Sequence, residues 1–153
     1  MKLNLHVLPL LILILYSYKK GGIVRLTKKQ KQQLLKEFKK VIDNWVGHVD
    51  FPFILLKMLE VHNNKSNDYA NEESPFANIE LCERGGFPAW KGVIIRLGDK
   101  YSRLLNALQG KLFKYEGVTD AFIDTAIYSI IGLIEYNRYE KEKKKEHNKK
   151  KKK

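Results

Sequence analysis

Apolar residues recur at steps of three and four along most of this chain, and that spacing constrains its fold more than any other feature. Such a step places the apolar side chains on one face of an α-helix. From Thr27, a fair N-cap, to Gly47 the repeat comprises Leu34, Leu35, Phe38, Val41, Ile42, Trp45 and Val46. A second, shorter helix is predicted from Phe53 to His62, with Pro52 near its first position.

Two further helices are predicted nearer the C-terminus. One runs from Trp90 to Leu108, with Arg96, Lys100 and Arg103 along one side and Asp99 opposite the apolar stripe. The other runs from Thr119, its predicted N-cap, to Tyr139 on a stripe formed by Ile123, Ile127, Ile130, Ile131 and Ile134. Between the second and third helices, the turn-rich residues 63–88 predict one long ordered loop of the kind that is usually functional. We therefore predict an all-α fold, a compact bundle of about four helices.

The two ends of the chain differ in composition from this domain, which we place at residues 21–140. Residues 1–20 form an apolar leader whose uninterrupted apolar part is shorter than the ~20 residues of a spanning helix. This leader is interpreted as a weak anchor, a signal, an upstream extension or an element packed on the domain. Residues 141–153 hold nine lysines against Glu142 and Glu146, so much of the net charge of +12 belongs to this tail. The tail is predicted to be disordered or a frayed extension of the last helix.

Cys82 is the single cysteine, which excludes an internal disulfide. It has no His- or Cys-rich neighbourhood, so we interpret it as a structural thiol. Nothing in the sequence suggests an oxidising compartment, and we expect a cytoplasmic protein. The alternative is membrane association through residues 3–18.

Acidic residues on the apolar face of the last helix form the candidate site. The helical period places Asp120 within that face and Asp124 on its margin, with Tyr128 one turn later. Two carboxylates four residues apart can share one Mg²⁺, which binds carboxylates, waters and substrate phosphates. Alternatively, Asp120 stabilises the first turn through the helix dipole, and Asp124 pairs with a cation of the neighbouring helix.

Four motifs together resemble a known family. They are Lys65-x-x-Asp68-Tyr69, Pro75-Phe76-x-Asn78, Arg96-x-x-Asp99-Lys100-x-x-Arg103 and Glu116-x-x-x-Asp120-x-x-x-Asp124-x-x-x-Tyr128. Over about residues 54–136 they resemble the phage-type family called nucleotide modification associated domain 1. The resemblance implies a role in phage nucleotide or DNA-modification metabolism, with no particular reaction.

The acidic ladder of the last helix is also similar to that of the MazG-like all-α nucleoside triphosphate pyrophosphohydrolases. This similarity implies Mg²⁺ held against nucleotide phosphates, and a homo-oligomer. Together the two resemblances imply metal binding by Asp120 and Asp124, catalytic roles for Asp99, Lys100 and Glu116, and substrate contacts from Lys65, Asp68, Tyr69, Asn78, Arg96, Arg103 and Tyr128. We expect no tandem Glu-x-x-Glu on a preceding helix, since Glu72 and Glu73 are adjacent, and this departure leaves the enzyme activity open.

The sequence thus predicts a nucleotide-handling domain that binds a nucleoside phosphate with Mg²⁺. A rival prediction is a non-catalytic nucleic-acid-binding protein that uses the lysine tail and the row of Arg96, Lys100 and Arg103. The tail has no interleaved aromatic residues, and no helix-turn-helix or zinc signature accompanies it. A third prediction, a membrane-tethered helical interaction module, depends only on the leader.

Overall fold

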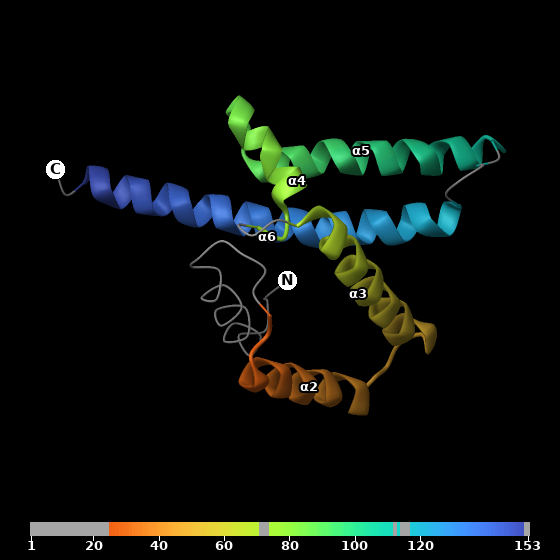
Figure 1. The fold of residues 1–153 in the computed structure, drawn as a ribbon. Coiled ribbons are helices and arrows are strands. Elements are labelled where there is room, and N and C mark those ends of the chain that lie inside the picture. The colour runs from red at the N-terminus through yellow and green to blue at the C-terminus, as the bar shows by residue number, and fades with distance from the viewer. Residues whose placement is uncertain (1–24, 71–73, 112, 114–116, 152–153) are drawn as a thin grey trace. The chain divides into compact units, whose positions relative to one another are not determined.

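The computed structural model describes residues 25–70, 74–111, 113 and 117–151, and these are all-helical, as predicted. Helices make up 82% of them, and they include no strand. In chain order these are α2 (Lys28–Asp43), α3 (Asp50–Tyr69), α4 (Ala77–Glu80), the 3-10 helix η2 (Leu81–Gly85), α5 (Ala89–Leu108) and α6 (Val118–Lys150) (Figure 1). The chain divides into two compact units, residues 1–77 and 78–153, which we describe separately. The predicted leader lies outside the described residues.

In the first unit, α2 begins where the sequence predicts. The hydroxyl of Thr27 accepts a hydrogen bond from the amide of Gln30 at 3.2 Å, and the amide of Thr27 donates to Oε1 of Gln30 at 2.8 Å. This reciprocal pair is a capping box, which satisfies amides that the first turn leaves free. The helix start is therefore determined locally.

The long loop predicted at residues 63–88 is largely wrong, because three helical segments occupy most of it. The helix α3 continues to Tyr69, and its last turn is closed by the amide of Ala70, which donates to the carbonyl of Ser66. Within this extension His62 Nε2 lies 3.5 Å from the Ser66 hydroxyl. The weak turn preference of the Asn- and Ser-rich segment is thus overridden by a helix that is already nucleated. Further along, α4 begins at Ala77 and η2 follows it directly.

The turn after η2 brings Cys82 against α5. Gly86 ends η2 with a φ of 79°, a left-handed conformation that glycine adopts without strain. The Cys82 thiol then donates to the carbonyl of Phe87, and a Cβ added at Gly92 would lie 2.9 Å from Cys82 Sγ. The absent side chain of Gly92 leaves room for the sulfur, which agrees with a structural thiol.

In the second unit, α5 and α6 form an antiparallel hairpin, in which they lie side by side (Figure 1). Its core consists of Ala89, Val93, Ala121, Ile127 and Ile131, all buried. A Cβ added at Gly132 would approach Val93 Cγ1 to 3.2 Å, so the two helices are closely packed there. The hairpin matches the two strongest sequence repeats.

The helix α6 differs from the prediction at both ends. Its N-cap is Gly117, two residues before the predicted Thr119, because the carboxylate of Asp120 accepts the Gly117 amide at 2.9 Å. At the other end α6 continues through residues 141–150, so this part of the tail is the helical extension and not the disordered segment. Among the described residues, none of the helices combines the length and the apolar character needed to cross a membrane.

Candidate functional site

The residues predicted to contact substrate divide between the two units. Lys65, Asp68 and Tyr69 lie on the last turns of α3 in the first unit and are exposed. Asn78 lies on α4 in the second unit and is partly buried. The three residues of α3 and Asn78 therefore belong to two units that are described separately.

The predicted residues of α5 split between two environments. Asp99 is exposed, and its carboxylate lies 3.9 Å from Arg96 of its own helix, also exposed. Lys100 instead points into the hairpin, where its Nζ lies 2.7 Å from Asp124 Oδ2. Arg103 is partly buried. Of the predicted catalytic residues that the structure describes, Lys100 lies beside a predicted metal ligand and Asp99 does not. Glu116 lies outside the described residues.

Asp120 and Asp124 of α6 each interact with a protein group, as the alternative to a shared Mg²⁺ predicted. Asp120 is exposed, not on the buried face as predicted, because α6 begins only at Val118 and the carboxylate turns back to the Gly117 amide. Asp124, predicted at the margin, is 4% exposed and paired with Lys100. Tyr128, one turn further, is partly buried. The Mg²⁺ expected on this pair stays a prediction.

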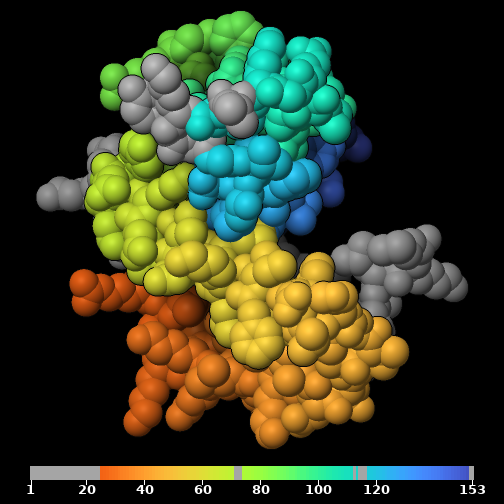
Figure 2. Space-filling model, turned by 90° about the vertical axis from the view of Figure 1, so that its right-hand side faces the viewer, coloured from red at the N-terminus to blue at the C-terminus, as the bar shows by residue number. Residues whose placement is uncertain are grey.

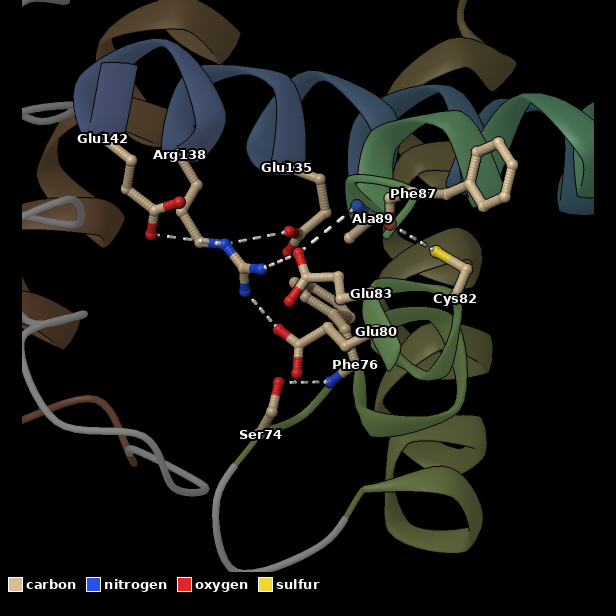
Figure 3. A network of polar contacts seen from close by, with 10 residues as sticks. All are labelled: Ser74, Phe76, Glu80, Cys82, Glu83, Phe87, Ala89, Glu135, Arg138 and Glu142. Carbon is tan, nitrogen blue, oxygen red and sulfur yellow. Dashed lines mark hydrogen bonds and ion pairs between the residues drawn. The ribbon is translucent and has the colours of Figure 1, made fainter. Parts of the chain in front are cut away.

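A second acidic group, unpredicted from the sequence, surrounds Arg138 of α6 (Figure 3). The two terminal nitrogens of the Arg138 guanidinium donate to Glu80 of α4 and Glu83 of η2. Its Nε lies 3.3 Å from Glu135 and 4.0 Å from Glu142, both on α6. We call Glu80, Glu83, Glu135 and Arg138 the acidic cluster. With all groups ionised it carries three negative charges against one positive charge.

Glu135 is the most unusual member of the acidic cluster. It is 1% exposed, and neither carboxylate oxygen has a hydrogen-bond donor among the described residues. Desolvation by burial raises the pKa of Glu135 to about 7; the charge of Arg138 opposes this shift, and the charges of Glu80 and Glu83 add to it. This carboxyl group therefore holds a proton up to neutral pH.

The other members have structural roles as well. Glu83 Oε1 also accepts the amide of Ala89, the first residue of α5, so it stabilises that helix start. Burial disfavours the charge of Arg138, but the charges of Glu135, Glu83 and Glu80 outweigh it and raise the pKa of the guanidinium. Arg138 thus stays charged and ties α4 and η2 to α6.

Two sequence signals could have found the acidic cluster. Glu80 and Glu83 have the Glu-x-x-Glu spacing immediately before α5, a single pair divided between α4 and η2 that the sequence analysis did not single out. Glu135 lies four residues after Ile131, on the apolar stripe of α6. The reasoning applied to Asp120, that a carboxylate on an apolar face needs a partner, applies to Glu135 with more force.

Comparisons with family models, curated proteins and solved structures gave no match for this chain. The resemblance of its motifs to the nucleotide modification associated domain 1 family stays a prediction.

Proposed function

We propose that this protein handles nucleoside phosphates with a divalent cation, and that Glu80, Glu83 and Glu135 hold the cation. The observation that carries the proposal is the buried carboxylate of Glu135, whose oxygens lack hydrogen-bond donors among the described residues. It lies beside two further carboxylates that share the Arg138 guanidinium (Figure 3).

Energetic cost is the first argument. A buried carboxylate without hydrogen bonds destabilises a fold, and the single positive charge of Arg138 does not neutralise three acidic groups. Groups whose pKa is strongly displaced by burial and by neighbouring charges concentrate at functional sites. We infer that the buried carboxylate of Glu135 is kept for binding and not for stability.

The chemistry of the donors is the second argument. Mg²⁺ binds carboxylate oxygens and usually retains waters and substrate phosphates in its coordination sphere. Among the described residues, no group of three or more His, Cys, Asp or Glu side chains is arranged to hold a metal ion as it stands. The Arg138 guanidinium lies between these carboxylates, so a cation has to displace it. Once displaced, the guanidinium is suited to a phosphate, which it binds through two parallel hydrogen bonds.

The choice of nucleoside phosphates depends on the sequence motifs. Glu80-x-x-Glu83 is one Glu-x-x-Glu pair, where the MazG-like pyrophosphohydrolases have a tandem arrangement, and the ladder of α6 resembles the nucleotide modification family. Asp120 and Asp124 stay the alternative ligands for the same cation. Each of them already has a protein partner, the Gly117 amide and Lys100 respectively, so we rank the acidic cluster first.

Manganese binding, measured by electron paramagnetic resonance, tests the proposal without requiring activity. We expect Mn²⁺ to bind the native protein and to be displaced by Mg²⁺. Glu135→Gln and Glu83→Gln should weaken Mn²⁺ binding at least about tenfold, since each removes a carboxylate ligand. Glu142→Gln is the matched control: Glu142 also faces Arg138, but it is 59% exposed and 4.0 Å away, and its loss should change binding little.

A nucleoside triphosphate panel, assayed with Mg²⁺ for binding and for pyrophosphate or phosphate release, follows. Release identifies a hydrolase, and metal-dependent binding without release identifies a carrier or a modification partner. Absence of Mn²⁺ binding, or equal loss in Glu142→Gln and Glu135→Gln, would refute the acidic cluster as the site. Loss only in Asp124→Asn would return the site to the predicted aspartates.

The helical extension of α6 favours a second candidate, non-specific nucleic-acid binding. Residues 141–150 are helical and exposed, and they include Lys141, Lys143, Lys144, Lys145, Lys149 and Lys150. Such a row contacts phosphates, and its affinity should fall with salt by a log–log slope of ~0.9 per phosphate neutralised. Ending the chain after Glu140 should remove most of this affinity. An unchanged salt slope in the shortened protein would refute the role of the extension.

A further inference from the structure

The helix α2 has an apolar face that is only partly covered in the described structure. At 100° per residue, Leu34, Leu35, Phe38, Val41 and Ile42 fall within a band roughly 120° wide. None of the α2 side chains is buried, and Leu35 is 68% exposed and Val41 56% exposed. A monomeric protein rarely exposes so many large apolar side chains together, and such surfaces mark a binding site for protein or membrane.

The apolar surface continues into the corner between α2 and α3. Val46 is 99% exposed, and Val49, Phe51 and Phe53 are exposed by half or more. Trp45 stacks on Phe51 with ring centroids 5.5 Å apart, and the Trp45 indole donates to the carbonyl of His48. Tryptophan and phenylalanine in this setting are typical of the boundary between headgroups and acyl chains. The helix and the corner therefore form one apolar surface within the first unit.

The charge of α2 indicates what kind of partner fits this surface. The helix carries six lysines and two acidic residues, a net charge of +4 in 16 residues. Lys28 and Lys39 follow one edge of the apolar band, while Lys29, Lys36 and Lys40 lie on the opposite face. The sixth lysine, Lys31, falls within the band one turn before Leu34 and is exposed. Two of these lysines make only exposed ion pairs, Lys39 with Asp43 and Lys40 with Glu37, which are weak. In the space-filling view, side chains of this orange segment project outward (Figure 2).

We propose that α2 and the following corner form a membrane-docking surface that lies in the interface of an anionic bilayer. An apolar band with Leu and Phe, beside a lysine-rich polar face, is the pattern of interfacial amphipathic helices. Lysines at the edge of the band reach the headgroups while their methylene stems stay in the apolar layer. The capping box at Thr27 satisfies the helix start without a protein partner. This surface lies outside the acidic cluster and does not depend on the proposed function.

Vesicle co-sedimentation of the full chain tests the proposal, with phosphatidylcholine vesicles compared with vesicles that also contain phosphatidylglycerol. We expect binding to the anionic vesicles and much weaker binding to the neutral ones. Phe38→Asp changes the apolar band, and Gln32→Asp makes a matched change of charge on the polar face of the same helix. Both variants retain the leader and the lysine tail, so any binding by those segments is common to them.

The ratio of the vesicle affinities of Phe38→Asp and Gln32→Asp isolates the contribution of the apolar side chain to binding. Gln32→Asp should weaken binding by about fivefold through charge alone. Phe38→Asp should weaken it at least about tenfold further, because the phenyl group no longer enters the apolar layer. Leu35→Asp, at a more exposed position, should behave like Phe38→Asp, and circular dichroism checks that both remain helical. Equal losses in all three variants, or no binding of the native chain to anionic vesicles, would overturn the proposal.

Discussion

Replacing Glu135 by glutamine should stabilise the protein at alkaline pH and leave it nearly unchanged at acidic pH. The glutamine amide has the shape of the protonated carboxyl group but carries no charge in a position that is 1% exposed. Burial raises the pKa of Glu135 from 4.5 to about 7, so the folded state binds this proton more tightly than the unfolded state does. Its contribution to the free energy of unfolding is therefore highest below pH 4.5 and falls as the pH rises to about 7.

The magnitude follows from that shift. A displacement from 4.5 to about 7 corresponds to about 3 kcal/mol in total, of which about 2.5 kcal/mol is lost between about pH 5 and about pH 8. Glu135→Gln should therefore raise the free energy of unfolding by about 3 kcal/mol near pH 8 and by under about 1 kcal/mol near pH 5. Glu142→Gln, which alters an exposed partner of the same guanidinium, should change it by less than about 0.5 kcal/mol at either pH.

Urea unfolding followed by the fluorescence of Trp90 measures these differences. Trp90 lies on α5 edge-on to Tyr136 of α6, at 5.6 Å between ring centroids, so it reports on the unit that holds Glu135. A Trp45→Phe background removes the other tryptophan, which belongs to the first unit. If Glu135→Gln destabilises the protein equally at both pH values, the charged carboxylate is a net stabilising partner of Arg138, and the reasoning is refuted.

Three further predictions concern other groups. Asp124→Asn should lower the free energy of unfolding by up to about 3 kcal/mol with or without Mg²⁺, because Asp124 pairs with the mostly buried Lys100. A loss of stability that depends on Mg²⁺ would instead support the predicted metal pair. Burial lowers the pKa of His62 from 6.5, so its contribution to stability should be present above that pH and lost below it, and a flat His62→Gln difference between about pH 7.5 and about pH 5 would contradict this. Gly92→Ala should lower the free energy of unfolding by about 1–3 kcal/mol, measured by thermal unfolding, since its Cβ would lie 2.9 Å from the Cys82 sulfur. Cys82→Ala should recover much of that loss, and additive effects of the two substitutions would show that the two residues do not touch.

The periodic parts of the sequence were predicted well because local chemistry determines them. The Thr27 cap, the course of α5 and the stripe of Ile127 and Ile131 follow from helical spacing and from capping. The segment after His62 was predicted poorly, because residue preferences for turns are weaker than the continuation of a formed helix.

The candidate site likewise combines a feature that the sequence predicted with one that it did not. Asp124 was predicted at the margin of the apolar stripe, and its pairing with Lys100 was one of the alternatives that the spacing of α5 and α6 allowed. The acidic cluster joins residues 55 and 58 positions apart in the chain, Glu83 and Glu80 with Arg138. No periodicity relates η2 to the middle of α6, so their contact could not be read from spacing alone.

The sequence by itself determined that this chain is helical, where its main amphipathic faces lie and how its lysines are distributed. These properties depend on interactions within a few residues, which the linear order contains. Only the tertiary structure decided which carboxylates are buried and which are exposed, and it brought Glu135 into the interior while leaving Asp120 as an exposed helix cap. Burial and pKa depend on what packs against a side chain from distant parts of the chain, and packing follows from the fold as a whole.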